Sequence, residues 1–398
     1  MVQCNSVQSS QDIGKMRENA GFDRSRIHLD HAGASFLSSA TVARMQQHLK
    51  LEEAICGYVA QERVMDELES VYQTLADCFG GGKDDYALTS SAVDSWNRLF
   101  YSVPINKGQN IVTTHTEYCS NYIAMLHDSE KRGFEIRVAH RLPNGDVDLD
   151  HLESLIDDQT ALLSVTWIGS SSGQILPAQK IGQIANRKNV LYLLDACQAF
   201  GHIYVDLDVI GCDMASGTAR KFLRGPRGIG FLYAGEHARS VMRPVMMTNQ
   251  SASWTQTNQY ECRTDARLFE AWERSVMNVL GFGVALSEFK QTGMQALTDQ
   301  TLATGRSLRE KLYSQADIIS ACPQGAEGAI ITFNKQGWSA VDIKSKLETM
   351  GIAVNVASVV HTRLDLEGRG IDTAVRVSPH YLTLQSECDR FLDALGAL

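Results

Sequence analysis

The chain has 398 residues, a net charge of −9 and a composition that is 44% hydrophobic, all ordinary for a globular enzyme with two domains. No stretch is basic enough to predict nucleic-acid binding, no apolar run is long enough for a membrane span, and MVQCNSVQSSQD lacks the apolar core of a signal peptide. The nine cysteines are scattered without CxxC pairs, which favours reduced thiols in a cytoplasmic protein over a disulfide framework or a metal site.

The first part of the chain predicts an arm, a loop and two helices. Residues 1–20 are polar, and we expect an arm or one helix packed on the smaller domain. The stretch RIHLDHAGAS, from Arg26 to Ser35, predicts a short strand that breaks into a loop of small residues. Ser38–Glu62 predicts a helix interrupted at Gly57, and Met65–Phe79 an amphipathic helix that glycines 80–82 terminate.

A strand, a turn of small residues and a helix follow in YALTSSAVDSWNRLFYSV. Such a turn leaves backbone N–H groups free at the helix N-terminus, which is a ready phosphate site. This turn contains Ser91, Ala92 and Val93. The alternative is a serine-rich helix cap that binds no phosphate, which would have the same sequence.

Strands and helices then alternate along the chain. Strands are expected at Asn110–Thr114, Phe134–Ala139 and Ala161–Thr166, and helices at Leu149–Ile156 and Ala178–Arg187. This alternation predicts an α/β fold with a mostly parallel sheet and right-handed crossovers. In open sheets of this kind, ligands bind beyond the carboxyl ends of the strands.

The most informative stretches are VLYLLDACQ, from Val190 to Gln198, and SGTARKFLRGPRGIGFL, from Ser216 to Leu232. The first reads as a buried strand ending in an acid and an amide, and the second places Lys221 before a glycine-rich return. Together they predict a pyridoxal 5'-phosphate (PLP) site. Lys221 would hold the cofactor as a Schiff base, Asp195 would pair with the ring nitrogen, and Gln198 would reach the ring hydroxyl.

The remainder of the chain predicts a second, smaller unit. Residues 245–275 look irregular until DARLFEAWERS, and a long helix starts near Met277. A small α+β unit is then expected, with helices at Thr301–Tyr313, Ala340–Met350 and Ser386–Leu395 and strands at Ala329–Phe333, Ala353–Val356 and Ala374–Ser378.

From about Leu29 to Leu382, this order of motifs resembles the class V aminotransferase family, which includes cysteine desulfurases, isopenicillin N epimerase and several C–S lyases. TARKFLRGPRG is more similar to the epimerase and C–S lyase branch, because desulfurases usually carry a histidine where Arg220 stands. The resemblance implies PLP-dependent transferase fold type I. It implies a large PLP-binding domain over 21–280 with a mostly parallel seven-stranded sheet, and a small α+β domain over 281–398. It also implies a homodimer whose sites draw on both subunits.

The resemblance also implies residue roles. Lys221 and Tyr118 would be catalytic, with the Tyr118 ring stacked on the cofactor. Main-chain groups at Ser91, Ala92 and Val93 would hold the cofactor phosphate together with Thr218 and Arg220. The further cofactor contact would be Ser170, in the loop WIGSSSGQILP.

The substrate would be an amino acid, and Arg376 in VRVSPHYL would bind its α-carboxylate. The loop with His31 and Ala32 would line the substrate mouth, where His31 is either a catalyst or loop scaffold. Tyr58 is either a core aromatic or part of the partner subunit's site wall. Asn121 either assists the substrate or caps a helix.

The loop SVVHTRLDLEGRGID, between Val356 and Ala374, contains no cysteine, whereas desulfurases carry their sulfur-accepting cysteine there. We therefore expect a PLP-dependent C–S lyase that eliminates a thiol or sulfenate from an S-substituted cysteine. The alternatives are an epimerase or aminotransferase on a specialised amino acid, and a cysteine desulfurase-like enzyme. A non-catalytic binding protein on the same fold is disfavoured by the intact set of Lys221, Asp195 and Gln198.

Overall fold

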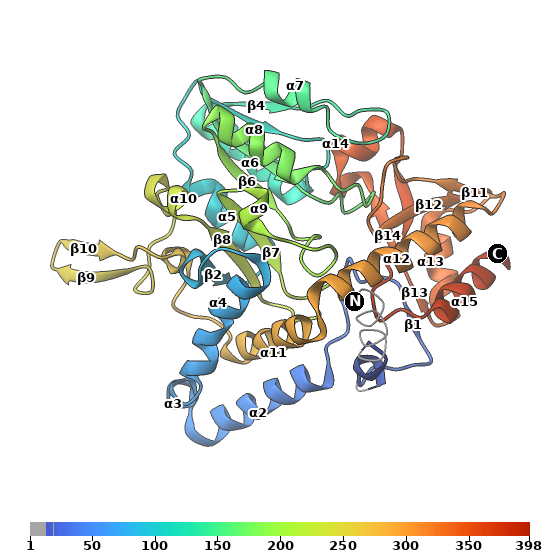
Figure 1. Ribbon diagram of the computed structural model, residues 1–398, viewed down its shortest axis with the longest axis horizontal. Helices are drawn as coiled ribbons and strands as arrows, with labels where there is room; N and C mark the ends of the chain where they lie inside the picture. The colour runs from blue at the N-terminus through green and yellow to red at the C-terminus, as the bar shows by residue number, and fades with distance from the viewer. Residues whose placement is uncertain (1–12, 19) are drawn as a thin grey trace, which may run out of the picture.

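The computed structural model describes residues 13–18 and 20–398 (Figure 1). The predicted arm at residues 1–20 therefore lies largely outside the described residues. Arg17 does contact the C-terminal part of the chain, because its guanidinium donates to the Leu382 carbonyl and forms an ion pair of 2.6 Å with Glu387.

A seven-stranded sheet organises the first two thirds of the chain, in the order β2-β8-β7-β6-β5-β3-β4. Strand β8 runs antiparallel to both of its neighbours, β2 and β7, and the strands from β7 to β4 all pair in parallel. The predicted α/β fold with a mostly parallel seven-stranded sheet is thus confirmed. The strands are β2 Tyr86–Thr89, β3 Asn110–Thr113, β4 Glu135–Val138, β5 Thr160–Thr166, β6 Leu191–Asp195, β7 Met214–Thr218 and β8 Gly230–Ala234.

Helices cover both faces of this sheet (Figure 1). Successive strand residues point to opposite faces, so Tyr192 and Leu194 of β6 join one apolar cluster while Leu193 joins another. One face packs against α4 (Met65–Phe79), α8 (Ala178–Lys188) and α11 (Val276–Thr292). The other packs against α5 (Ala92–Ser102), α6 (Cys119–Arg132) and α10 (Glu236–Val241). This double coverage explains why the central strands read as continuous apolar runs.

The C-terminal part forms a four-stranded antiparallel sheet in the order β11-β12-β15-β14. Its strands are β11 Ile318–Ser320, β12 Ile331–Lys335, β14 Asn355–Ser358 and β15 Thr373–Val377, and its helices are α12 Met294–Tyr313, α13 Ala340–Thr349 and α15 Gln385–Gly396. These elements enclose their own apolar cluster.

The segment before α2 also joins the C-terminal part. Strand β1 (Ile27–His28) pairs in parallel with β13 (Ile352–Ala353), and Asp30 bridges to Ser378. This pairing carries the loop 30–35 to the boundary between the two sheets.

Two local predictions were wrong. The helix expected over 38–62 divides into α2 (Ser39–Ile55) and α3 (Gly57–Glu62), and the break lies at Cys56, whose φ is +68°, rather than at Gly57. The stretch 245–275 contains a hairpin of β9 (Ala252–Gln256) and β10 (Gln259–Cys262) that projects from the body (Figure 1). Both strands are mostly exposed, so they carry no alternation of apolar and polar residues by which to recognise them.

Further short helices are residues 13–18, α7 Leu149–Ser154, α9 Leu207–Ile210 and α14 Arg363–Leu366, with single 3₁₀ turns at Lys83–Asp85, Ala266–Phe269, Val359–His361 and Glu367–Arg369. Across the described residues, no helix combines the length and apolar character that a membrane span requires.

Candidate active site

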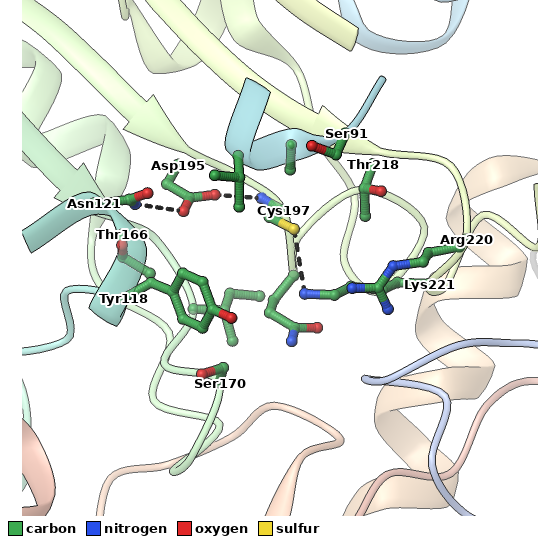
Figure 2. A pocket seen from close by; sticks show the side chains of 14 residues that line it. Ser91, Tyr118, Asn121, Thr166, Ser170, Asp195, Cys197, Thr218, Arg220 and Lys221 are labelled. Atoms are coloured by element: carbon green, nitrogen blue, oxygen red, sulfur yellow. Dashed lines mark hydrogen bonds between the residues drawn. The ribbon is translucent and has the colours of Figure 1, made fainter. Parts of the chain in front are cut away.

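A pocket opens beyond the carboxyl ends of β5, β6 and β7, next to the N-termini of α5 and α6 (Figure 2). Every residue predicted to bind the cofactor lines it, although these residues come from segments more than a hundred positions apart. The lining consists of Ser91, Ala92, Val93, Tyr118, Asn121, Thr166, Ile168, Ser170, Asp195, Cys197, Gln198, Thr218, Arg220 and Lys221.

Asp195 ends β6 and marks the acidic end of the pocket. Its carboxylate is buried, and Oδ1 accepts a hydrogen bond of 2.9 Å from the Cys197 backbone N–H. Oδ2 accepts one of 2.8 Å from the Asn121 amide. Asn121 thus contacts Asp195, and the residue at the N-cap of α6 is Tyr118. The structure therefore does not support a helix cap at Asn121.

Glu117, which was not among the predicted site residues, precedes Tyr118 and is buried beside this acidic end. Its Oε1 accepts hydrogen bonds from the Asn121 amide (2.8 Å) and the Tyr118 backbone N–H (2.9 Å) and from the Thr166 hydroxyl. Burial raises the pKa of Glu117 to about 7, with the Thr166 hydrogen bond opposing and the Asp195 charge adding to the rise. The position of a glutamate after a strand does not by itself predict this role, because its partners Thr113 and Thr166 come from β3 and β5.

The opposite end of the pocket is the N-terminus of α5, where Ser91 and Thr218 lie close together (Figure 2). Ser91 caps the helix by accepting a hydrogen bond of 3.1 Å from the Asp94 N–H. The first-turn N–H groups of Ala92 and Val93 have no acceptor within the helix. Gly230 allows this arrangement, because a Cβ there would lie 2.2 Å from the Ser91 carbonyl carbon. This end suits a phosphate.

Lys221 follows β7, and its side-chain nitrogen lies 3.2 Å from the Cys197 sulfur. Burial raises the pKa of the Cys197 thiol, although the Lys221 charge opposes the rise. The Arg220 guanidinium donates to the Gly33 carbonyl, which ties the lysine segment to the loop 30–35. Tyr118 lies across the pocket from Lys221 (Figure 2), and partial burial raises the pKa of its phenol.

A second hollow adjoins the first and shares Tyr118, Ser170, Gln198, Arg220 and Lys221 with it. Ala32, Asn355, His361 and Arg376 are among its further lining residues.

Arg376 donates from Nη2 to Asp30 Oδ1 (2.8 Å) and from Nη1 to the Ser170 carbonyl (3.1 Å). Asp30 Oδ2 also accepts a hydrogen bond from the Asn355 amide at 2.9 Å. Arg376 belongs to β15 of the four-stranded sheet. Its guanidinium is held in place by Asp30, near the start of the chain, and by the Ser170 carbonyl, in the loop after β5.

Two predicted substrate residues lie elsewhere. His31 is buried, stacks on His380 with ring centroids 4.6 Å apart, and lines neither hollow, so the structure favours loop scaffold over catalyst. Tyr58 is 67% exposed and lines a separate hollow with Trp272 and Arg274, so it is not a core aromatic.

The pocket fits PLP on an observation independent of the motifs. Gln198 Nε2 donates to the Ala32 carbonyl at 3.2 Å, but its Oε1 is buried and has no hydrogen-bond partner. Such an orphaned acceptor costs free energy unless a ligand donates to it, and the hydroxyl of the cofactor ring is a suitable donor. Asp195 Oδ2 could accept from a ring N–H, Lys221 would supply the amine, and the N-terminus of α5 suits the phosphate.

The chain is similar to known proteins over most of its length. A probable cysteine desulfurase from Methanothermobacter thermautotrophicus is 26% identical over 379 residues, which cover 92% of each chain. A cysteine desulfurase from Klebsiella pneumoniae is 27% identical over 388 residues, covering 93% of this chain and 92% of the relative. The apo structure of the cysteine desulfurase from Thermococcus onnurineus has a TM-score of 0.90 at 20% identity, over 96% of this chain and 97% of that one.

The family model for Aminotransferase class-V matches residues 27–391, which is most of the sequence. PLP is the cofactor that this match and the architecture of the pocket imply. The chain therefore belongs to the class V aminotransferase family of fold-type-I PLP enzymes.

Proposed function

We propose that the protein is a PLP-dependent C–S lyase that acts on an S-substituted cysteine. In the proposed reaction, the cysteine conjugate and water yield a thiol, pyruvate and ammonia, and a cysteine sulfoxide would release a sulfenate in place of the thiol. The observation that carries the proposal is the absence of any cysteine between Cys322 and Cys388, a range that includes Asn355, His361 and Arg376 of the second hollow.

The residues of the pocket suit this chemistry. Bound PLP supplies an electron sink that acidifies the α-hydrogen of an amino acid. Lys221 would hold the cofactor and then accept the α-proton, and Asp195 would keep the ring nitrogen protonated. Arg376 would bind the α-carboxylate through its planar guanidinium. A β-elimination requires no nucleophile from the protein beyond Lys221.

A cysteine desulfurase-like reaction is the second candidate, because the relatives described above carry that name. That reaction needs a thiolate that reaches the substrate sulfur, and a thiolate needs exposure or a positive setting. Cys119 lines neither hollow, and burial raises the pKa of Cys197. An epimerase or aminotransferase is the third candidate, because Lys221 and Arg376 would serve it equally.

Large apolar side chains on the surface favour a homodimer. Tyr58, Trp272 and Val59 are large apolar side chains that remain 67%, 51% and 43% exposed. We propose that they are covered in a homodimer, which light scattering of the purified protein would detect as twice the mass of 43.9 kDa.

The decisive experiment incubates the holoenzyme with cysteine, cystine and a panel of S-alkyl cysteines and their sulfoxides. Pyruvate and ammonia in equal amounts would support elimination, together with sulfide from cysteine, a persulfide from cystine, a thiol from an S-alkyl cysteine or a sulfenate from a sulfoxide. Lys221→Ala is the inactive control. Alanine together with a protein-bound persulfide would establish the desulfurase reaction instead. Solvent deuterium at Cα without pyruvate would favour the epimerase.

A further inference from the structure

Two buried carboxylates, Glu117 and Asp195, share one amide group at the acidic end of the pocket. The Asn121 side-chain nitrogen donates to Glu117 Oε1 and to Asp195 Oδ2, each at 2.8 Å. All three residues are buried, with exposed fractions of 2% for Glu117, 6% for Asp195 and 1% for Asn121. The hydrogen-bond donors to the two carboxylates in the described residues are hydroxyl, amide and backbone N–H groups, none of them a cation.

Glu117 is itself held in place on every side. Besides Asn121, its Oε1 accepts from the Tyr118 backbone N–H and the Thr166 hydroxyl, and its Oε2 accepts from the Thr113 hydroxyl at 3.0 Å. These donors come from β3, β5 and the start of α6, which are rigid elements of the large sheet. The hydrogen bonds offset part of the cost of burying a carboxylate.

This arrangement determines which way the Asn121 amide faces. An amide has an NH₂ group at one end and a carbonyl at the other. Because Glu117 accepts one N–H, the other N–H is directed at Asp195 Oδ2. Either carboxylate would repel the carbonyl oxygen of the amide, so the pair holds the NH₂ group between them, and Glu117 fixes the position from which Asn121 donates to Asp195.

We infer that Glu117 is a positioning residue, which acts through Asn121 to orient Asp195 and to strengthen its hold on the proton of the cofactor's ring nitrogen. The inference rests on the PLP cofactor and on no choice among the candidate reactions. Glu117 itself does not line the pocket, so it touches neither cofactor nor substrate. Its negative charge, when present, adds to that of Asp195 and favours a protonated ring.

The test measures the ring nitrogen directly. PLP labelled with ¹⁵N in the ring is bound to the enzyme, and its chemical shift is followed by NMR from about pH 6 to 10, without substrate. In Glu117→Gln, which keeps the acceptor oxygen but removes the charge, we expect the titration midpoint to fall by about one pH unit, the lower end of shifts caused by a nearby charge. Glu130→Gln, an exposed residue on the same helix, is the matched control and should titrate like the parent.

A second variant covers the case in which Glu117→Gln fails to fold or to retain PLP. Thr113→Val is nearly isosteric, lies outside the pocket and removes only the donor to Oε2, so it should favour the neutral form of Glu117. We expect a smaller fall of the midpoint in this variant. A midpoint equal to that of the parent in Thr113→Val, or in a Glu117→Gln that retains PLP, would overturn the inference. A failed lyase assay would leave these measurements unaffected.

Discussion

The side-chain nitrogen of Lys221 lies 3.2 Å from the sulfur of Cys197, at the centre of the pocket. The thiol is nevertheless poorly suited to accept sulfur, because burial raises its pKa and keeps it protonated. We expect Cys197→Ser to retain most of the lyase activity, within about threefold, because the hydroxyl can still accept a hydrogen bond from the lysine.

Cys119→Ser is the matched control, since this thiol adjoins Tyr118 but lines neither hollow. Both variants are assayed for pyruvate released from one cysteine conjugate. Loss of activity in Cys197→Ser alone, with a persulfide trapped on Cys197 in the parent, would contradict the elimination.

Lys221→Ala should abolish turnover, with a loss beyond the roughly 10²–10⁴-fold typical of a positioned acid–base group, because this residue both holds the cofactor and moves the proton. Borohydride reduction followed by peptide mass spectrometry should attach the cofactor to Lys221 in the parent. The control is Lys344→Ala, an exposed lysine of α13. Cofactor attached to another lysine would show that the site is misassigned.

Arg376→Lys should lower kcat/KM by roughly tenfold or more, because a charged hydrogen bond contributes about 1.5–3 kcal/mol and an ammonium cannot replace the planar fork. The residue is suited to this test because Asp30 and the Ser170 carbonyl already hold the guanidinium in place. Arg363→Lys, on an exposed ion pair with Glu367, should leave kcat/KM unchanged. If amines that lack the carboxylate react as fast as amino acids in the parent, Arg376 has another role.

Stability should fall on acidification because of the buried histidines His31, His202 and His380. Burial lowers the pKa of each, to about 4 for His202. Below about pH 6.5 these imidazoles bind protons in the unfolded chain but stay neutral in the folded protein, so the unfolded state is favoured. The free energy of unfolding should therefore be unaffected by these residues above pH 6.5 and decrease between pH 6.5 and about 4, by up to about 1.4 kcal/mol per pH unit for each group.

Urea denaturation of the holoenzyme at pH 7.5, 6 and 5 measures this dependence. His202→Gln should flatten the slope between pH 6 and 5, whereas the exposed His127→Gln should not. An equal slope in the parent and His202→Gln would show that the imidazole does not carry the effect.

The sequence alone determined the features that depend on residues close together in the chain. Apolar runs between turn residues predicted the strands of the large sheet, and their alternation with helices predicted its parallel pairing. In parallel sheets all strands end at one edge, so the motifs at Asp195, Tyr118 and Ser170 could be assigned to one site before any contact was known. The roles of these residues remain predictions, although one pocket gathers them.

Only the tertiary structure decided the features that depend on contacts between distant segments. The pairing of β1 with β13 brings Ala32 and Asp30 to Arg376, across more than 340 positions. The environment of Glu117 is built by β3, β5 and the start of α6 together, and its burial could not be predicted from its neighbours in the sequence. Burial and charge are properties of the surroundings of a side chain, and those surroundings exist only once the chain has folded.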